Sequence, residues 1–236
     1  MKFDILTLFP DVVHTYASES ILGRAQQKKL ITVQTHNFRE FTLDKQHHVD
    51  ERPYGGGPGM ILQVEPIYRC LESLGLVKDG RKSKVKSLKS KVIIMDPAGK
   101  KFDQRMAEKF SKLDSLVLVS GRYEGFDERV YKFIDEKISV GDYVLAGGEL
   151  PSLTIVEATA RLIPGVLGNS ESLKEETHGK YPTLYPSPIR GGARGGVVAE
   201  YPQYTRPENF MGLKVPKLLT EGNHKKIAEW QKKKSK

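Results

Sequence analysis

The order of apolar and polar residues predicts short buried strands that alternate with amphipathic helices. Residues 3–9 form an apolar run interrupted by only two polar side chains, which indicates a mostly buried first strand that ends at Pro10. Helical spacing follows from about residue 11 to residue 28, and the sequence ITVQTHNF at 31–38 predicts a second strand. The N-terminal part is therefore predicted to run strand, helix, strand.

A long segment without periodicity comes next, over residues 39–60. It ends in DERPYGGGPGM, where four glycines fall within five residues. A loop of this length inside a compact domain is usually functional. The following segment, 64–75, spaces its apolar residues as a helix that closes at Gly75.

Two similar pairs of a strand and a helix follow. KVIIMDPAGK reads as a continuous apolar strand that stops at a turn, and FDQRMAEKFSKL after it has helical spacing. SLVLVSGRYEG and FDERVYKFI repeat this pattern, and ISVGDYVLAGG then leads into a helix over ELPSLTIVEATARLI. Apolar strands that are each followed by a helix imply a parallel sheet covered on both faces. The sequence therefore predicts an α/β domain over residues 1–163.

The pattern changes beyond this domain. Residues 164–200 carry glycine, proline and serine with little periodicity, which is typical of a flexible interdomain linker. Residues 201–236 contain short helical patterns and predict a small, mostly helical C-terminal domain.

Composition narrows the class of protein. Apolar residues make up 38% of the 236 residues, and no window approaches the roughly 20 consecutive apolar residues of a membrane span. The N-terminal apolar run is too short and too interrupted for a signal peptide. Cys70 is the only cysteine, so an intrachain disulfide and a thiolate metal site are excluded. We expect a cytoplasmic protein without a membrane partner.

The charge is unevenly distributed. The formal net charge is +9, and the segment 78–91 together with the C-terminal sequence WQKKKSK holds much of the excess. Such clusters indicate a polyanionic partner, with nucleic acid first among the candidates. The alternative is a lysine-rich solubilising loop and a solvated tail.

Three turns at predicted strand ends are the candidate ligand site. In an open parallel sheet, ligands bind beyond the carboxyl ends of the strands. The turns MDPAGK, SGRYEG and SVGDYVLAGGE bring small residues to these ends and leave backbone N–H and C=O groups free for a ligand. A purely geometric role in tight turns is the alternative for each one, but three in succession favour a small-molecule pocket.

Other sites are not supported by residue spacing. No glycine-rich segment has the P-loop spacing, and FPDVV stands where a dinucleotide fingerprint would need its glycines. The consecutive residues HHVDE, at 47–51, have suitable side chains for a metal but rarely converge on one ion, so no metal site is predicted. Cys70 lies in an apolar helical pattern and is expected in the core.

Six motifs together resemble one family. DERPYGGGPGM, SGRYEGFDERV, SVGDYVLAGGELP, RLIPGVLGN, YPQYTRPE and GNHKKIAEW resemble, in this order, the bacterial tRNA (guanine-N1)-methyltransferases of the TrmD family, in the SPOUT superfamily. The resemblance implies a deep trefoil knot in the α/β domain and a homodimer with each active site at the subunit interface. It implies S-adenosylmethionine as methyl donor and N1 of guanosine 37 of tRNA, next to the anticodon, as acceptor.

Two other functions stay open. One is a related knotted methyltransferase that acts on another RNA base or ribose, and the other is an RNA-binding homologue with impaired catalysis. The resemblance associates the family with Mg²⁺ but leaves open whether the ion takes part. The family continues with further helices beyond AEWQ, so the resemblance implies a truncated tRNA-binding domain here.

The resemblance also implies the donor and substrate residues. Its donor-binding motifs fall on Pro58, Gly59, Pro97, Gly121, Tyr123, Glu124, Val140, Gly141, Asp142, Tyr143, Val144, Leu145, Gly147 and Gly148. Glu124 is expected beside the methionine end, and a salt bridge from Glu124 to Arg129 is the structural alternative. Asp50 and Arg52 become candidates for holding the guanine or the partner subunit.

The catalytic pair implied by the resemblance is Arg161 and Glu176. Arg161 matches the arginine that contacts the guanine, and Glu176 stands where the family has its aspartate base. Glu175 and Glu171 are neighbours that could take the role of base. A glutamate with an ordinary pKa of roughly 4.3 is a weak base at neutral pH, so we expect Arg161 to make N1 more acidic by stabilising charge on O6.

Overall fold

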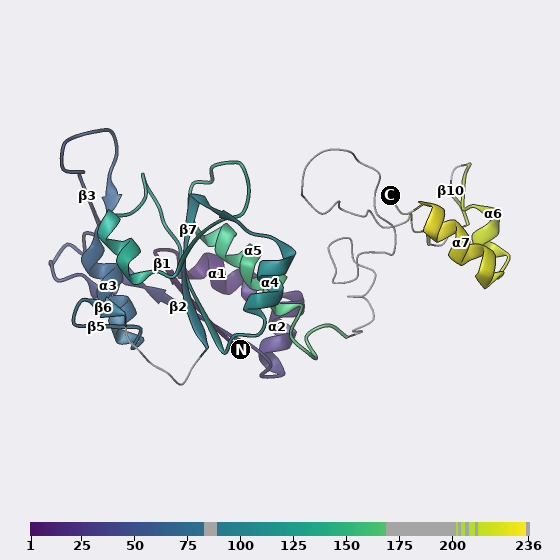
Figure 1. Ribbon diagram of the computed structural model, residues 1–236, viewed down its shortest axis with the longest axis horizontal. Helices are drawn as coiled ribbons and strands as arrows, with labels where there is room; N and C mark the ends of the chain where they lie inside the picture. Colours follow the sequence, from purple (N-terminus) through teal and green to yellow (C-terminus); the bar gives the residue numbers. More distant parts are fainter. Residues whose placement is uncertain (83–88, 169–201, 203, 206–207, 211, 235–236) are drawn as a thin grey trace. The chain divides into compact units, whose positions relative to one another are not determined.

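The computed structural model describes residues 1–82, 89–168, 202, 204–205, 208–210 and 212–234 (Figure 1). It divides into two compact units, Met1–Gly168 and Asn169–Lys236. Glu176, Glu175 and Glu171 lie outside the described residues, as does most of the predicted linker. No helix in the described part of the chain combines the length and the apolar character that a membrane span needs.

The first unit is built on one five-stranded sheet in the order β2-β1-β8-β7-β9. Its strands are β1 (Lys2–Thr7), β2 (Thr32–Asn37), β7 (Ser90–Lys101), β8 (Ser115–Val119) and β9 (Glu136–Ser139). Every neighbouring pair is parallel, and Phe3 of β1 faces Val33 on one side and Leu116 on the other. The predicted α/β class with a parallel sheet is confirmed.

Helices cover both faces of the sheet, as the apolar strands predict (Figure 1). One face carries α1 (Pro10–Ala17), α2 (Ser20–Gln27), α4 (Gln104–Phe110) and α5 (Glu149–Ala160). The other carries α3 (Val64–Ser73) with the 3₁₀ helices η1 (Phe38–Phe41) and η2 (Glu128–Phe133). Because side chains alternate along a strand, Ile5 packs into the first core and Leu6 into the second.

Two predicted elements differ in the structure. The helix expected over 11–28 is two helices, because Glu19 is extended, with φ −95° and ψ 160°, and separates the end of α1 from the start of α2. The strand expected to stop at MDPAGK continues to Lys101, with its register shifted between Met95 and Lys100. Met95 and Lys100 both pair with Ile138, so residues 96–99 bulge out of the strand.

The long segment 39–60 is partly regular. After η1, β3 (Asp50–Glu51) pairs antiparallel with β4 (Ile61–Leu62), and the glycine-rich residues form the connection between them. Leu62 also bridges to Phe126, which ties this ribbon to the loop after β8. A second short ribbon, β5 (Val77–Lys78) with β6 (Arg81–Lys82), forms the start of the basic segment 78–91.

The second unit has its own short elements. They are the hairpin strands β10 (Asn209–Phe210) and β11 (Leu213–Lys214) and the helices α6 (Lys217–Thr220) and α7 (His224–Lys234). The rings of Tyr204 and Trp230 lie 6.4 Å apart between centroids.

Candidate functional site

The bulge of β7 and the loops at the carboxyl ends of β8 and β9 surround a cavity of about 320 Å³. This is the size range in which small-molecule sites begin. Most of the predicted donor-binding residues line it, namely Pro97, Gly121, Tyr123, Glu124, Val140, Tyr143, Val144, Leu145, Gly147 and Gly148. Pro97 lies in the bulge of β7 and lines the cavity from there.

The other predicted donor residues lie around these loops. Gly141 packs against the ring of Tyr143, and Asp142 forms an ion pair with Lys101. Gly59 lies against the side chain of Glu124: a Cβ added at Gly59 would be 2.8 Å from Glu124 Oε1. Pro58 is exposed in the connection between β3 and β4.

Three cavity glycines allow the loops to approach one another. A Cβ on Gly121 would lie 2.5 Å from the ring of Phe126, and one on Gly148 would lie 2.6 Å from Ser120 Cα. Gly148 N donates to Gly121 O at 2.9 Å, so the two loops touch through their backbones. A Cβ on Gly147 would lie 2.6 Å from Arg122 Cζ. These glycines are therefore needed for loop–loop packing, independently of any ligand.

The charges around the cavity favour a cationic ligand. Asp96, Glu124 and Glu128 contribute carboxyl groups to its lining. Arg122 is the single Lys, Arg or His side chain among the described residues that line it. The excess of negative charge lowers the free energy of a positively charged molecule in the cavity.

Sequence reasoning missed the partners of Arg122. Its guanidinium Nη2 lies 2.9 Å from Oε2 of Glu149, the first residue of α5. Thr7, at the end of β1, donates from Oγ1 to Glu149 Oε1 at 2.8 Å, and the ring of Phe9 lies 4.3 Å from Arg122 Cζ. The sequence did contain a signal for this pair: Arg122 directly follows the glycine of SGRYEG, and Glu149 directly follows the glycines of AGGE, so two opposite charges stand beside two loops of the same site.

A second missed feature is the contact between Tyr131 and Asp96. Tyr131 donates from its hydroxyl to Asp96 Oδ2 at 2.8 Å, and both residues line the cavity. Burial, and then this hydrogen bond, raises the pKa of Tyr131 above its usual range. Tyr131 is therefore a hydrogen-bond donor at neutral pH, and it fixes one carboxylate oxygen at the edge of the cavity.

The alternative salt bridge from Glu124 to Arg129 is wrong. Arg129 binds Asp127 instead, through Nε to Oδ1 at 2.8 Å and Nη2 to Oδ2 at 2.6 Å. The side-chain hydrogen bond from Arg129 holds the pKa of Asp127 below its usual range. Glu124 remains part of the cavity lining.

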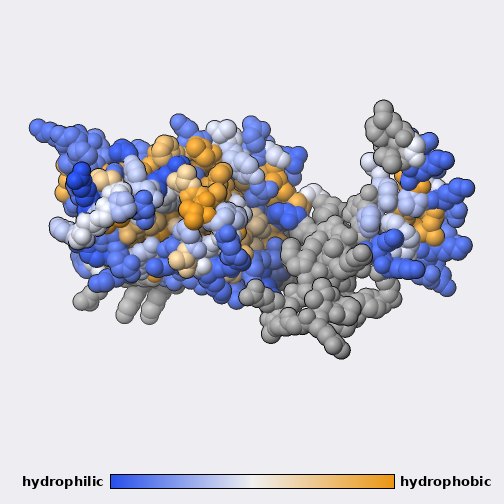
Figure 2. All heavy atoms as spheres, turned by 90° about the horizontal axis from the view of Figure 1, so that it is seen from above, coloured by the Kyte–Doolittle hydropathy of each residue, from blue (hydrophilic) through white to orange (hydrophobic). Residues whose placement is uncertain are grey.

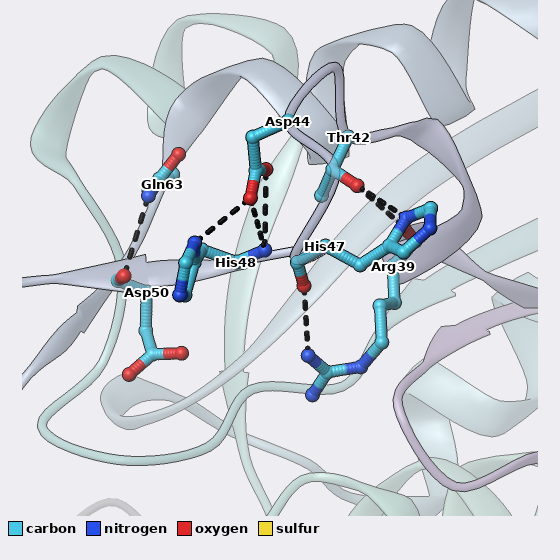
Figure 3. A network of polar contacts seen from close by, with 7 residues as sticks. All are labelled: Arg39, Thr42, Asp44, His47, His48, Asp50 and Gln63. Carbon is cyan, nitrogen blue, oxygen red and sulfur yellow. Dashed lines mark hydrogen bonds and ion pairs between the residues drawn. The ribbon is translucent and has the colours of Figure 1, made fainter.

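The segment before Asp50 is organised by its own hydrogen bonds (Figure 3). Asp44 accepts from His48 N and lies 2.8 Å from His48 Nδ1, and the backbone hydrogen bond lowers the pKa of Asp44. Thr42 Oγ1 lies 2.9 Å from His47 Nδ1. Among the described residues no group of three or more His, Cys, Asp and Glu side chains is placed to hold a metal ion.

The two substrate candidates lie on the β3–β4 ribbon. Figure 3 shows the Asp50 carboxylate pointing away from Gln63, whose amide donates to the Asp50 backbone oxygen at 3.3 Å. Arg52 is exposed and lines a hollow of about 450 Å³ together with Gly56, Gly59 and Met60. Gly59 therefore borders this hollow and also contacts Glu124, which lines the cavity described above.

The catalytic candidates are described only in part. Arg161 follows the last residue of α5 and donates from its backbone N to Glu157 O at 3.2 Å. Glu176 lies outside the described residues.

Cys70 is buried in α3, and burial raises the pKa of its thiol to about 12, so it is no nucleophile at neutral pH.

Comparison with known proteins identifies relatives over the whole chain. The family model described as tRNA (Guanine-1)-methyltransferase TrmD matches residues 1–236. The tRNA (guanine-N(1)-)-methyltransferase of Lactobacillus johnsonii is 48% identical over 235 residues, which cover 99% of this chain and 85% of that protein. The proteins of the same name from Carboxydothermus hydrogenoformans and Enterococcus faecalis are 44% and 43% identical, with 100% of this chain covered and 83% and 86% of theirs.

Proposed function

This chain belongs to the tRNA (guanine-1)-methyltransferase family, and we propose that it methylates N1 of guanosine 37 of tRNA with S-adenosylmethionine bound at the β7, β8 and β9 loops. The chain is thus a tRNA (guanine-N1)-methyltransferase. The observation that carries the donor site is the glycine-walled cavity at the carboxyl ends of these strands. Because its substrate is tRNA, we assign the enzyme to the cytoplasm.

The cavity fits the donor chemically. Val140, Val144 and Leu145 offer apolar walls for adenine, and the neighbouring glycine backbones offer hydrogen-bonding groups at its rim. The donor carries a sulfonium, an ammonium and a carboxylate group and is cationic overall, which suits a lining with more carboxylates than cations. Glu124 is the carboxylate that we assign to this cationic end. When bound, the donor supplies an electrophilic methyl group.

The other requirements of the reaction concern the guanine that accepts the methyl group. Guanine N1 must lose a proton as it is methylated, so the enzyme needs a proton acceptor and a group that stabilises charge on O6. We assign proton acceptance to Glu176 and stabilisation of O6 to Arg161. Asp50 and Arg52 are assigned to holding the guanosine.

The family resemblance also supports a trefoil knot. The loops after β8 and β9 touch through the hydrogen bond from Gly148 N to Gly121 O, and α5 then packs against α1 and α4. Close contact between these two loops is compatible with such a knot. For residues 201–236 we propose a tRNA-binding domain, whose lysine-rich end would contact phosphates.

We propose that the enzyme is a homodimer joined through an apolar face on α1 and α5. This α1–α5 face consists of Phe9, Val12, Tyr16 and Leu150, which are all exposed in the single chain. On the face of the first unit that Figure 2 displays, hydrophobic side chains gather in a patch among hydrophilic ones. An exposed apolar cluster next to a ligand cavity is the kind of surface that a second subunit covers.

Leu150→Asp is expected to convert the dimer into a monomer. The side chain is 59% exposed, so the fold tolerates the change, and Asp near the start of α5 suits the helix dipole. In the dimer the same carboxylate would be buried without a partner. Light scattering after gel filtration measures the mass. Leu43→Asp, at another exposed leucine, is the control and should leave the mass unchanged. A parent protein that is already monomeric contradicts the dimer.

The function is tested by single-turnover methylation of a tRNA transcript, followed by mapping of the modified base. We expect one methyl group on N1 of guanosine 37, and none when that guanosine is replaced by adenosine. Methylation of another nucleotide would refute the proposed substrate. No transfer at saturating donor, with intact tRNA binding, would identify an RNA-binding protein instead.

A further inference from the structure

We propose that Arg122 and Glu149 are a positioning pair that holds the donor-binding loops in their active arrangement. Together with Thr7 and Phe9 they form what we name the Arg122–Glu149 clamp. The inference rests on the proposed donor site and adds two residues that act on it through the loops.

Glu149 is the anchor of this clamp. Its side chain is 2% exposed, so its charge must be compensated inside the protein. The carboxylate has two partners, Thr7 Oγ1 at 2.8 Å and Arg122 Nη2 at 2.9 Å, and it stands at the first turn of α5, where the helix dipole favours a negative charge. A buried ion pair adds little net stability compared with apolar packing, but it selects one arrangement of the groups it joins.

Arg122 is held on more than one side. Phe9 covers its guanidinium with the ring centroid 4.3 Å from Cζ. Gly147 approaches so closely that a Cβ on it would lie 2.6 Å from Cζ and 2.6 Å from Glu149 Oε2. The Nε atom of Arg122 and the Oε2 atom of Glu149 are both buried without a hydrogen-bond partner among the described residues, so the 2.9 Å contact from Nη2 to Oε2 is an ion pair. The pair, rather than a full set of hydrogen bonds, therefore fixes the guanidinium.

The clamp connects two segments that line the donor cavity to the end of β1. Arg122 belongs to the turn after β8, whose next residue, Tyr123, adopts a φ of 59° and lines the cavity with Glu124. Glu149 follows directly on Gly147 and Gly148 of the loop after β9. Thr7 ends β1, where its Oγ1 also accepts from Phe9 N at 2.9 Å. Loss of the charge pair should thus loosen the cavity walls while both cores stay packed.

Titration of S-adenosylmethionine by calorimetry tests this inference in the full-length chain. We expect Glu149→Gln and Arg122→Met each to weaken donor affinity by about tenfold, and the double variant to be no weaker than either, because the interaction is lost only once. At saturating donor kcat should stay within about twofold of the parent, so the effect appears in the donor KM.

Matched variants separate positioning from general destabilisation. Glu136→Gln removes the partner of Lys91, 3.0 Å away at the opposite end of the strands, and should leave donor affinity unchanged. Thr7→Val should weaken donor affinity, and Thr7→Ser, which keeps the hydroxyl, should restore it. These two variants keep the test valid if Glu149→Gln does not fold.

Each result bears on one proposal. A parent protein that does not bind the donor refutes the donor site itself. If the parent binds the donor, unchanged affinity in Glu149→Gln overturns the positioning pair. Additive losses in the double variant, or losses that only follow the unfolded fraction at the assay temperature, overturn it as well.

Discussion

Gly148→Ala is expected to weaken binding of S-adenosylmethionine at least about 100-fold, which corresponds to roughly 2.7 kcal/mol. The backbone of Gly148 has a φ of −86°, so alanine suits the dihedral angles and the cost comes from space alone. The new Cβ would lie 2.6 Å from Ser120 Cα and 2.7 Å from Gly121 N. These are backbone atoms, which cannot rotate away as a side chain would.

The two loops must therefore separate, and both of them wall the donor cavity. Separation also stretches the 2.9 Å hydrogen bond from Gly148 N to Gly121 O. Calorimetric titration of the donor and a thermal melt measure the two consequences, and we expect the Tm to fall as well because overpacking costs about 1–3 kcal/mol. Gly168→Ala is the matched control, since a Cβ there meets nothing within 4 Å. Parent-like donor affinity in Gly148→Ala would show that these loops do not form the donor site.

The fold was predictable where one physical signal dominated. Apolar strands followed by helices predicted the parallel sheet with two covered faces, because an apolar strand face left in water raises the free energy of the folded chain. The break before Ser20 was not predictable, since the apolar spacing continues across it. The bulge at 96–99 was missed because Asp, Pro and Gly in sequence also describe an ordinary turn, and only pairing with β9 on both sides distinguishes the two.

The candidate site was predictable in its location and less so in its internal contacts. The rule that ligands bind at the carboxyl ends of parallel strands led to the three glycine loops that surround the cavity. The partners of Arg122 and Tyr131 come from residues 27 and 35 positions away along the chain (149 − 122 and 131 − 96), and spacing carries no signal over such distances. Glu124 and Arg129, close in sequence, are not the pair that forms.

Glu176→Gln is expected to reduce the single-turnover rate of methyl transfer about 100-fold or more, while the affinities for donor and tRNA stay near those of the parent. Glutamine has nearly the shape of glutamate and can still hydrogen-bond to guanine, but it cannot accept the N1 proton. General-base catalysis of this kind typically contributes 10²–10⁴-fold. Rapid-quench kinetics with labelled donor measure the chemical step, and filter binding measures the tRNA affinity.

Glu175→Gln is the matched control for this variant, because it makes the same chemical change one residue away. We expect it to retain most of the parent's rate. Loss in Glu175→Gln with a parent-like rate in Glu176→Gln would transfer the role of base to the neighbour. If both variants react like the parent, neither Glu175 nor Glu176 accepts the proton, which leaves Glu171 or solvent as the acceptor, while Arg161 lowers the pKa of N1 by stabilising charge on O6. Arg161→Lys tests the O6 contact separately, because lysine keeps the charge but loses the planar pair of donors, and a loss of rate would assign this contact to the guanidinium.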